Sequence, residues 1–298
     1  MSDFRLSVFY AVAKRLSFTR AAAELFISQP AVTRHVHELE AQYGTKLFER
    51  EGSSVRLTPA GDRLLRHAED VFALQRALQA DLDALLDRHG GMLRLGASTT
   101  IAQYVIPPLL AGFRQQFPGV SVTLLNGNTE QVEGALLHRE IELGIIEGRS
   151  KKAGIRYSPF LEDRLVLVTA AGHPLTKRKA IAPADLTQVP LLLREPGSGT
   201  LEVIEHALKP WKIGLSHLQV EMQLGSTESI KSYLVHSGCA AFLSIHSIAK
   251  ELDNGSLAVV PVTGLPIERS FYFIQLQGKA EPLAEIFLKF ARGRHNPK

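Results

Sequence analysis

The chain has 298 residues, a formal net charge of +4 and one cysteine, Cys239. This length allows two or three domains with their own cores, and the net charge is too small to identify a partner by itself. One cysteine excludes an internal disulfide framework and a metal site built from several cysteines. No secretory signal pattern and no run of about 18 apolar residues occurs, so a cytoplasmic protein without a membrane partner is expected.

Residues 17–61 predict two short helices joined by a tight turn, followed by a small hairpin. Ser17 can cap the first helix, because its hydroxyl can accept a hydrogen bond from a free amide at the helix start. Ser28 can cap the second helix, which Gly44 is expected to end. The hairpin is predicted between 46 and 57, around a glycine-bearing turn. This order is typical of a winged helix–turn–helix.

The second helix has an outer face rich in hydrogen-bond donors, which suits the major groove of DNA. A helix of this kind places its N-terminal residues against base edges, while its partner helix crosses the backbone. Gln29, Thr33 and Arg34 are expected to read bases, and neighbouring residues to hold phosphates. The full set predicted to contact DNA is Thr19, Arg20, Ser28, Gln29, Pro30, Thr33, Arg34, Arg50 and Arg56. A plain three-helix packing unit is the alternative.

Thr58 and Pro59 are expected to start a long helix that ends near His89, before a pair of glycines. Apolar positions in it alternate spacings of four and three residues, the pattern of a coiled-coil seam. The predicted seam residues are Leu64, Ala68, Val71, Gln75, Leu78, Leu82 and Leu85. We therefore expect this helix to pair two copies of the chain. Packing against its own chain is the alternative.

From Met92 onward, predicted strands alternate with predicted helices, as in parallel α/β units. Helix is expected from 101 to 117, and a second course of strands begins near Leu165. Two similar lobes would result, joined by two crossovers near 161–163 and 264–268. The expected division is 1–58 for the winged helix–turn–helix, 59–90 for the linker helix, 91–162 with 267–298 for lobe I, and 163–266 for lobe II.

Loops rich in hydroxyl groups follow several of these predicted strands. In open α/β sheets, ligands bind at the carboxyl ends of the strands, where helix N-termini offer unpaired amide protons. A small anion or carboxylate suits such a cleft. The residues expected to line it are Ser98, Thr99, Thr100, Asn128, Thr129, Glu147, Gly197, Ser198, Gly199, Thr200 and Thr227. Each loop could instead serve only to cap its helix.

The sequence contains none of the common nucleophile, zinc or nucleotide-binding motifs. Three classes of protein remain as interpretations: a ligand-responsive transcription factor, a transport-type solute receptor, and an α/β enzyme fused to a DNA-binding module. The missing signal pattern argues against the receptor, and the missing motifs argue against the enzyme. We therefore expect no catalytic activity and no cofactor or metal, only a small-molecule effector.

Several strings occur together in an order that resembles LysR-type transcriptional regulators. They are Phe9 with Ala13, and the runs 18–23, 28–33, 47–50 and 57–61. The resemblance covers the whole chain. It implies a winged helix–turn–helix, a dimerising linker helix and a two-lobed effector domain like that of periplasmic binding proteins. It also implies binding to a double-stranded DNA operator as a homodimer or homotetramer, with a small co-inducer, and RNA polymerase as a further candidate partner.

Residues 194–200 and 224–228 most resemble the branch that includes regulators of sulfur assimilation and carbon fixation. Effectors in that branch include inorganic oxyanions and phosphorylated metabolites, so an oxyanion is the leading candidate, beside a carboxylate. Glu147 departs in charge from what such a ligand needs. It could repel an anion or hold a cationic part of a larger ligand.

Overall fold

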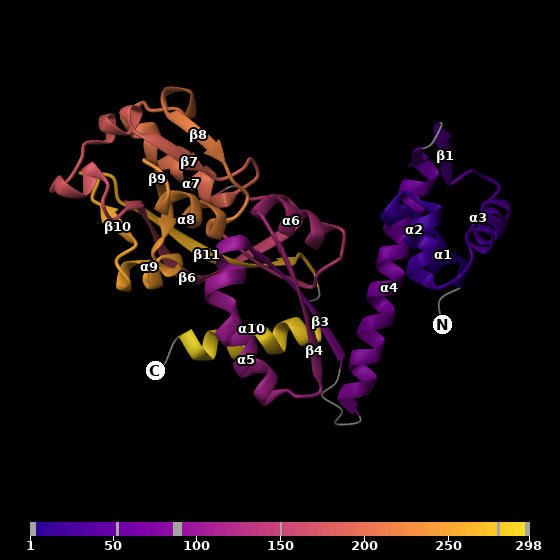
Figure 1. Ribbon diagram of the computed structural model, residues 1–298. Coiled ribbons are helices and arrows are strands. Elements are labelled where there is room, and N and C mark those ends of the chain that lie inside the picture. Colours follow the sequence, from indigo (N-terminus) through magenta and orange to yellow (C-terminus); the bar gives the residue numbers. More distant parts are fainter. Residues whose placement is uncertain (1–3, 52–53, 86–90, 150, 279–280, 296–298) are drawn as a thin grey trace. The chain divides into compact units, whose positions relative to one another are not determined.

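The structure is a computed structural model that describes residues 4–51, 54–85, 91–149, 151–278 and 281–295. The chain divides into two compact units, Met1–Leu86 and Asp87–Lys298. Figure 1 labels most of their helices and strands.

The first unit is the predicted winged helix–turn–helix with the long helix attached. Its elements are α1 (Phe4–Arg15), α2 (Phe18–Leu25), α3 (Gln29–Tyr43), β1 (Phe48–Glu51), β2 (Ser54–Leu57) and α4 (Pro59–Leu85). The caps form as predicted: Ser17 accepts a hydrogen bond from the amide of Arg20, and Ser28 from that of Ala31. Gly44 ends α3 with a φ of +65°, a conformation that glycine adopts without strain.

The core of this unit forms between α1, α2, α3 and the hairpin. The predicted inward stripe of α3 is confirmed, because Val32, Val36 and Leu39 are each at most 2% exposed. They pack with Phe9 of α1 and Leu47 beside the hairpin. Burial of this stripe leaves the opposite face of α3 to solvent.

The start of α4 is tied closely to the hairpin. The Thr58 hydroxyl accepts a hydrogen bond from the amide of Gly61 at 3.0 Å and donates one to the carbonyl of Lys46 at 2.7 Å. A side chain at Gly61 would place its Cβ 2.1 Å from the carbonyl oxygen of Leu47. Only glycine therefore permits this approach.

The predicted coiled-coil seam of α4 is wrong in its first part. Leu64 packs against the core of the helix–turn–helix and Ala68 is 0% exposed, so these two positions contact their own chain. Further along, the apolar side chains are exposed: Val71, Leu74, Leu78 and Leu82. Leu74 was absent from the predicted seam. We call these four residues the α4 stripe. The predicted end near His89 lies outside the described residues.

Nine described strands of the second unit form one mixed sheet, in the order β4-β3-β5-β11-β6-β9-β7-β8, with β10 pairing β6. The strands are β3 (Gly91–Ser98), β4 (Val120–Gly127), β5 (Leu143–Ile146), β6 (Ile155–Ala170), β7 (Pro190–Leu193), β8 (Gln219–Gln223), β9 (Ala240–Ser244), β10 (Leu257–Val260) and β11 (Ile267–Leu276). β3 is parallel to β4 and β5, and β7 is parallel to β8 and β9. The long antiparallel strands β6 and β11 join these two groups.

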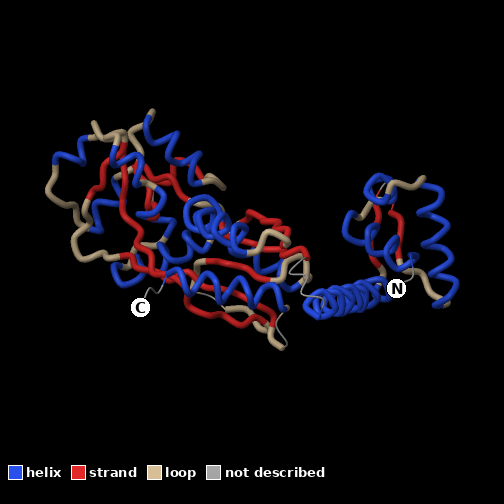
Figure 2. Tube along the Cα trace, turned by 90° about the horizontal axis from the view of Figure 1, so that it is seen from below, coloured by secondary structure: helices blue, strands red, loops and turns tan. Residues whose placement is uncertain are grey.

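Two lobes result, as the alternation of strands and helices predicted. The helices are α5 (Ile106–Gln116), α6 (Thr129–Leu137), α7 (Gly199–Leu208), α8 (Thr227–Val235), α9 (Ala249–Asp253) and α10 (Pro282–His295). Figure 2 shows helices beside the strands of both lobes. The last helix, α10, packs on α5 and β3, so the end of the chain completes the first lobe (Figure 1).

Two sequence-based boundaries are corrected here. The strand predicted from Leu165 begins ten residues earlier, at Ile155; Pro159 and the charges that follow it resemble a loop in the sequence. The helix predicted over 101–117 starts with a π-helical turn at Ile101–Val105. The prolines after Ile106 lack amide protons for regular helical bonds, and the amide of Ile106 bonds to the carbonyl of Ile101 instead.

Candidate DNA-binding surface and effector site

The outer face of α3 presents the residues predicted to read bases. Ser28, Gln29, Pro30 and Arg34 are exposed, and Thr33 is half-buried. The Gln29 side-chain amide donates to the Thr33 hydroxyl at 2.8 Å, and the Arg34 guanidinium lies 3.4 Å from the carboxylate of Glu38. Both contacts run along the helix surface, so the polar groups are held in place without being buried.

The residues predicted to hold phosphates lie on other elements of the same unit. Thr19 and Arg20 are exposed in the first turn of α2, and Arg56 is exposed on β2. The backbone of Arg50 belongs to β1, but its side chain lies outside what the structure describes.

Glu40, which the sequence did not single out, fixes the hairpin to the end of α3. Its carboxylate accepts hydrogen bonds from the backbone amides of Leu47 and Phe48, at 2.9 and 3.5 Å, and from the Lys46 ammonium at 2.9 Å. Burial alone would raise the Glu40 pKa, but these bonds outweigh it and lower the pKa below its usual value.

In the second unit, predicted effector residues converge on Glu147, which is 1% exposed directly after β5. Its carboxylate accepts hydrogen bonds from the hydroxyl of Ser98, at the end of β3, and from that of Thr200, at 3.0 Å in the first turn of α7. Its carbonyl accepts one from Thr129 at 2.7 Å. A Cβ at Gly199 would lie 2.2 Å from that carbonyl oxygen, so glycine lets α7 approach. Side chains from both lobes thus meet at one carboxylate.

The floor of this cluster comes from the two long strands and was missed in the sequence. Arg269 of β11 donates to the Thr200 hydroxyl at 2.8 Å and lies 3.5 Å from the Glu147 carboxylate. Its Nε also donates to Asp163 of β6 at 2.6 Å, and Asp163 accepts a bond from Ser244 at 2.7 Å. The sequence did contain a signal for these residues, because charged side chains occur at or beside both predicted crossovers. Charged groups that become buried need partners of opposite charge.

The buried cluster holds two carboxylates, Glu147 and Asp163, against the one guanidinium of Arg269. Two polar atoms beside it are buried with no hydrogen-bond partner among the described residues: the Ser198 hydroxyl and Nη2 of Arg269. Buried polar atoms without partners are rare and often mark a ligand position. The cluster therefore holds two kinds of donor. The Ser98 and Thr200 hydroxyls are already hydrogen-bonded, whereas the Ser198 hydroxyl and Nη2 of Arg269 have no such bond within the part of the chain that the structure describes.

Of the other predicted effector residues, Thr99, Thr100, Asn128 and Thr227 are buried and Gly197 is half-buried. The Thr99 hydroxyl accepts a bond from Arg194 at 3.2 Å, and Asn128 both caps α6 and donates to the Pro196 carbonyl at 3.3 Å. Asn128 therefore caps its helix, as the alternative interpretation required, and in addition contacts the other lobe. Thr100 and Thr227 are 3% and 2% exposed, in front of the π-helical turn and at the start of α8. Gly197 adopts a φ of +83°.

A second set of contacts also joins the two lobes. The Tyr104 hydroxyl, in the π-helical turn, donates to the carboxylate of Glu228 on α8. Lys231 of α8 lies 3.0 Å from that carboxylate and 5.0 Å from the centre of the Tyr104 ring. Burial, and then the bond to Glu228, raise the pKa of Tyr104. The tyrosine is therefore a neutral donor, and its bond to Glu228 is a second contact between the lobes.

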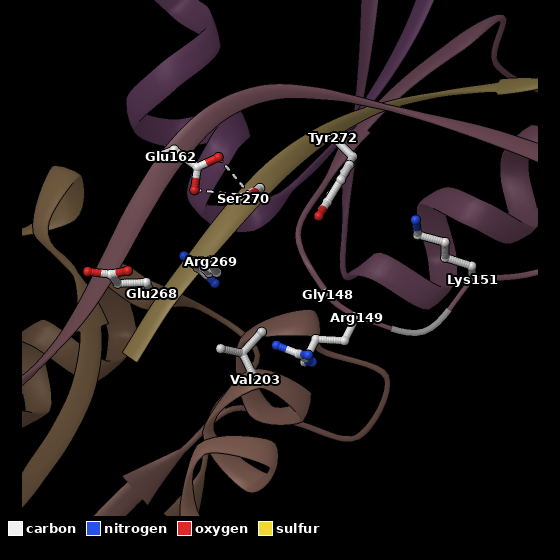
Figure 3. Close-up of a pocket in the computed structure, with 9 residues that line it drawn as sticks. All are labelled: Gly148, Arg149, Lys151, Glu162, Val203, Glu268, Arg269, Ser270 and Tyr272. Atoms are coloured by element: carbon white, nitrogen blue, oxygen red, sulfur yellow. Dashed lines mark hydrogen bonds between the residues drawn. The ribbon is translucent and has the colours of Figure 1, made fainter. Parts of the chain in front are cut away.

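A pocket of about 340 Å³ lies beside the cluster and has Arg269 and Gly148 in its wall. Figure 3 shows the residues that line it. It is lined by Gly148, Arg149, Lys151, Glu162, Val203, Glu268, Arg269, Ser270 and Tyr272. Both cationic and anionic side chains line it, and Glu162 accepts hydrogen bonds from Ser270 (Figure 3). This mixture of charges does not select one class of ligand.

Within the described residues, no three His, Cys, Asp or Glu side chains are grouped to hold a metal ion. The described helices include none that is both long and apolar enough to cross a membrane.

Comparison with known proteins identifies both units. Residues 4–62 match the family model "Bacterial regulatory helix-turn-helix protein, lysR family", and residues 87–296 match "LysR substrate binding domain". The chain belongs to the LysR family. As a LysR-type protein it is a DNA-binding transcriptional regulator and not an enzyme, and the receptor and enzyme interpretations are set aside.

Its relatives include the carbon-fixation and sulfur regulators that the resemblance predicted. It is 34% identical to the transcriptional activator CmpR of Synechocystis over 96% of this chain and 93% of CmpR. It is 35% identical to CbbR of Rhodospirillum rubrum, over 97% and 95% of the two chains. Identity to CysL of Bacillus subtilis is 30%, over 90% and 89%.

Two solved structures agree with the fold. The regulatory domain of Synechocystis CcmR, in complex with 2-PG, is 29% identical, with a TM-score of 0.63 over 68% of this chain and 97% of that domain. Full-length CbnR bound to its target DNA is 24% identical, with a TM-score of 0.68 over 98% and 99% of the two chains. The CbnR likeness concerns the fold alone.

Proposed function

We propose that this LysR-type regulator reads a DNA operator with α3 and that a small anion, bound between the lobes of the second unit, controls this binding. The observation that carries the proposal is the buried cluster of Ser98, Glu147, Thr200 and Arg269. It joins both lobes through groups that recognise an anion. The ligand is an inorganic oxyanion or a small carboxylate, and no other cofactor is involved.

The DNA-binding part of the proposal rests on the exposed N-terminal face of α3. Gln29 and Arg34 carry the paired donors and acceptors that recognise adenine and guanine edges. Thr19 and Arg20 of α2, together with Arg50 and Arg56 of the hairpin, hold phosphates, which orients the reading helix. With bases read by α3 and phosphates held by α2 and the hairpin, residues 1–58 form the part of the chain that contacts the operator.

The linker residues 59–90 pair two chains through the α4 stripe, whose four side chains are between 39% and 73% exposed. Contiguous apolar side chains of this kind mark a contact with another protein surface. We propose a homodimer, or a homotetramer built from such pairs, acting in the cytoplasm on DNA. Contact with RNA polymerase remains a prediction from family resemblance.

The effector part rests on what the cleft offers between lobe I (91–162 and 267–298) and lobe II (163–266). Hydroxyl groups converge from both lobes, α7 begins at the cluster, and Arg269 supplies a buried positive charge. The unused Ser198 hydroxyl is a further donor for a ligand oxygen. The CcmR relative, bound to 2-PG in its regulatory domain, supports a ligand in this domain.

Glu147 gives the proposed site a specific mechanism. Its carboxylate occupies the hydroxyl groups of Ser98 and Thr200, which are the donors that an anion needs. An arriving anion would have to replace this internal carboxylate or bind beside it. Ligand binding would then replace some of the contacts that join the two lobes. This change would be transmitted to the DNA-binding units of the paired chains.

The experiment that tests the effector site is an anion screen of the purified full chain. Sulfate, phosphate, acetate and 2-PG are compared at constant ionic strength, and an anion that binds the folded state raises the melting temperature. Thr200→Ala should weaken binding of the active anion by about tenfold in calorimetry, because a buried charge-assisted bond is lost. Thr187→Ala, on the surface of the same lobe, serves as the control. Equal affinity for both variants would remove the cluster from the site.

A further inference from the structure

Phe26 occupies an unusual place in the first unit. It is 94% exposed, the largest value among the exposed large hydrophobic side chains of the described residues. Its neighbours Leu25 and Ile27 pack against the core of the unit, whereas the ring of Phe26 points away from it. Packing therefore does not explain a phenylalanine at this position.

The backbone of Phe26 is also unfavourable for a bulky residue. It follows the last residue of α2 with a φ of +54° and a ψ of +39°, in the left-handed region. Glycine and asparagine are the usual residues at such a helix end, and a bulky residue there is an outlier. Strained backbone of this kind collects at functional sites. Asparagine would suit the local fold better, so a benefit outside folding is needed.

The position of Phe26 indicates that benefit. It lies two residues before Ser28, the cap of α3, and so extends the exposed row formed by Ser28, Gln29 and Pro30. We propose that the Phe26 ring packs against the C5-methyl group of a thymine in the major groove and so determines part of the operator sequence. Apolar side chains recognise thymine in this way. The proposal rests on the proposed entry of α3 into the major groove.

The test removes that methyl group alone. A duplex operator is first selected from a random pool with the full chain, and each thymine is then replaced singly by deoxyuridine. For the natural protein, we expect about fourfold weaker binding at one thymine of each half-site, the effect of exposing one buried carbon. Phe26→Asn should bind the two duplexes equally, and Phe26→Tyr should keep the difference.

Leu16 supplies a matched control. It follows the last residue of α1 with a φ of +45°, and it is 48% exposed. Leu16→Asn should raise thermal stability as Phe26→Asn does, yet keep the full deoxyuridine effect. The proposal is overturned if Phe26→Asn retains the effect, or if no thymine of the operator shows one. A lower oligomer mass for Phe26→Asn with an unchanged effect would assign the ring to a protein interface instead. Failure to select any operator would contradict the proposed function itself.

Discussion

Glu147 is the residue on which the chemistry of the cleft depends. It is a buried carboxylate inside a site whose hydroxyl groups suit an anion. Two negative charges at such close range repel by several kcal/mol even at an effective dielectric constant near 20. Which charge the ligand can carry therefore depends on whether the negative charge of Glu147 stays in place.

We predict that Glu147→Gln, which keeps the shape and removes the charge, strengthens binding of the active anion by at least about tenfold, or about 1.4 kcal/mol. The measurement is isothermal titration calorimetry at fixed ionic strength. Glu142→Gln is the control, because Glu142 is also an arginine-paired glutamate, beside Arg94 at the opposite end of β5. Weaker binding by Glu147→Gln would show instead that the carboxylate holds a cationic part of the ligand.

The lowered pKa of Glu40 predicts how the stability of the first unit depends on pH. Its pKa is lower in the folded chain than the reference value of 4.5, so its bonds to the hairpin stabilise the first unit above that pH. This contribution is lost as the pH falls through the folded-state pKa. Glu40→Gln should cost about 1–3 kcal/mol at pH 7, because buried amides lose a charged acceptor.

Urea unfolding of the full chain, followed by circular dichroism, measures this difference. The difference in the free energy of unfolding between the natural protein and Glu40→Gln should become smaller when the pH is taken below about 4.5. Glu49→Gln, at an exposed position of the hairpin, should leave stability within about 0.5 kcal/mol. A gap that stays constant with pH would contradict this role of Glu40.

Residues were predictable where a local rule applies and were missed where distant segments meet. Ser17 and Ser28 were identified because a helix cap depends on neighbours within three positions. Arg269 and Asp163 pair across 106 positions, on two strands whose register no local pattern reveals. Glu40 was missed although its partners lie only six to eight positions further along, because they follow the end of α3 and so fall outside the helical spacing of three or four residues.

The α4 helix shows that one regular spacing of apolar residues can supply side chains to two different surfaces. Its spacing of apolar residues predicted a single seam, but Leu64 and Ala68 pack inside their own unit. The exposed remainder, with Leu74 added, forms the α4 stripe. Periodicity reports which residues are apolar, and it does not report which surface covers them.

We predict that Leu78→Glu separates the paired chains, because it places a charge in the middle of the α4 stripe. The apparent dimer dissociation constant should rise by at least about tenfold, as measured by light scattering across a dilution series. Arg66→Glu, which also introduces a glutamate at an exposed position of the same helix, is the control. An unchanged mass for Leu78→Glu would place the pairing surface elsewhere.

At the scale of the whole molecule, the order of the elements was predictable and the closure of the lobes was not. The switch from helices to alternating strands and helices separates the two units, and both family models follow that division. The positions predicted for the crossovers fall on β6, which is one strand of 16 residues, and at the start of β11. The contacts between lobes at Glu147 and Tyr104 depend on side chains brought together only by the finished fold.

We propose that an anion in the cleft controls operator binding. Fluorescence anisotropy of the selected operator, titrated with full chain at constant ionic strength, tests this over a series of anion concentrations. We predict that saturating anion changes the operator dissociation constant at least about fivefold for the natural protein, in the usual range of coupling between sites, and that Thr200→Ala needs about tenfold more anion for half of its change. The same anion dependence in both proteins, or no change in the natural protein with any anion that binds, would contradict this control.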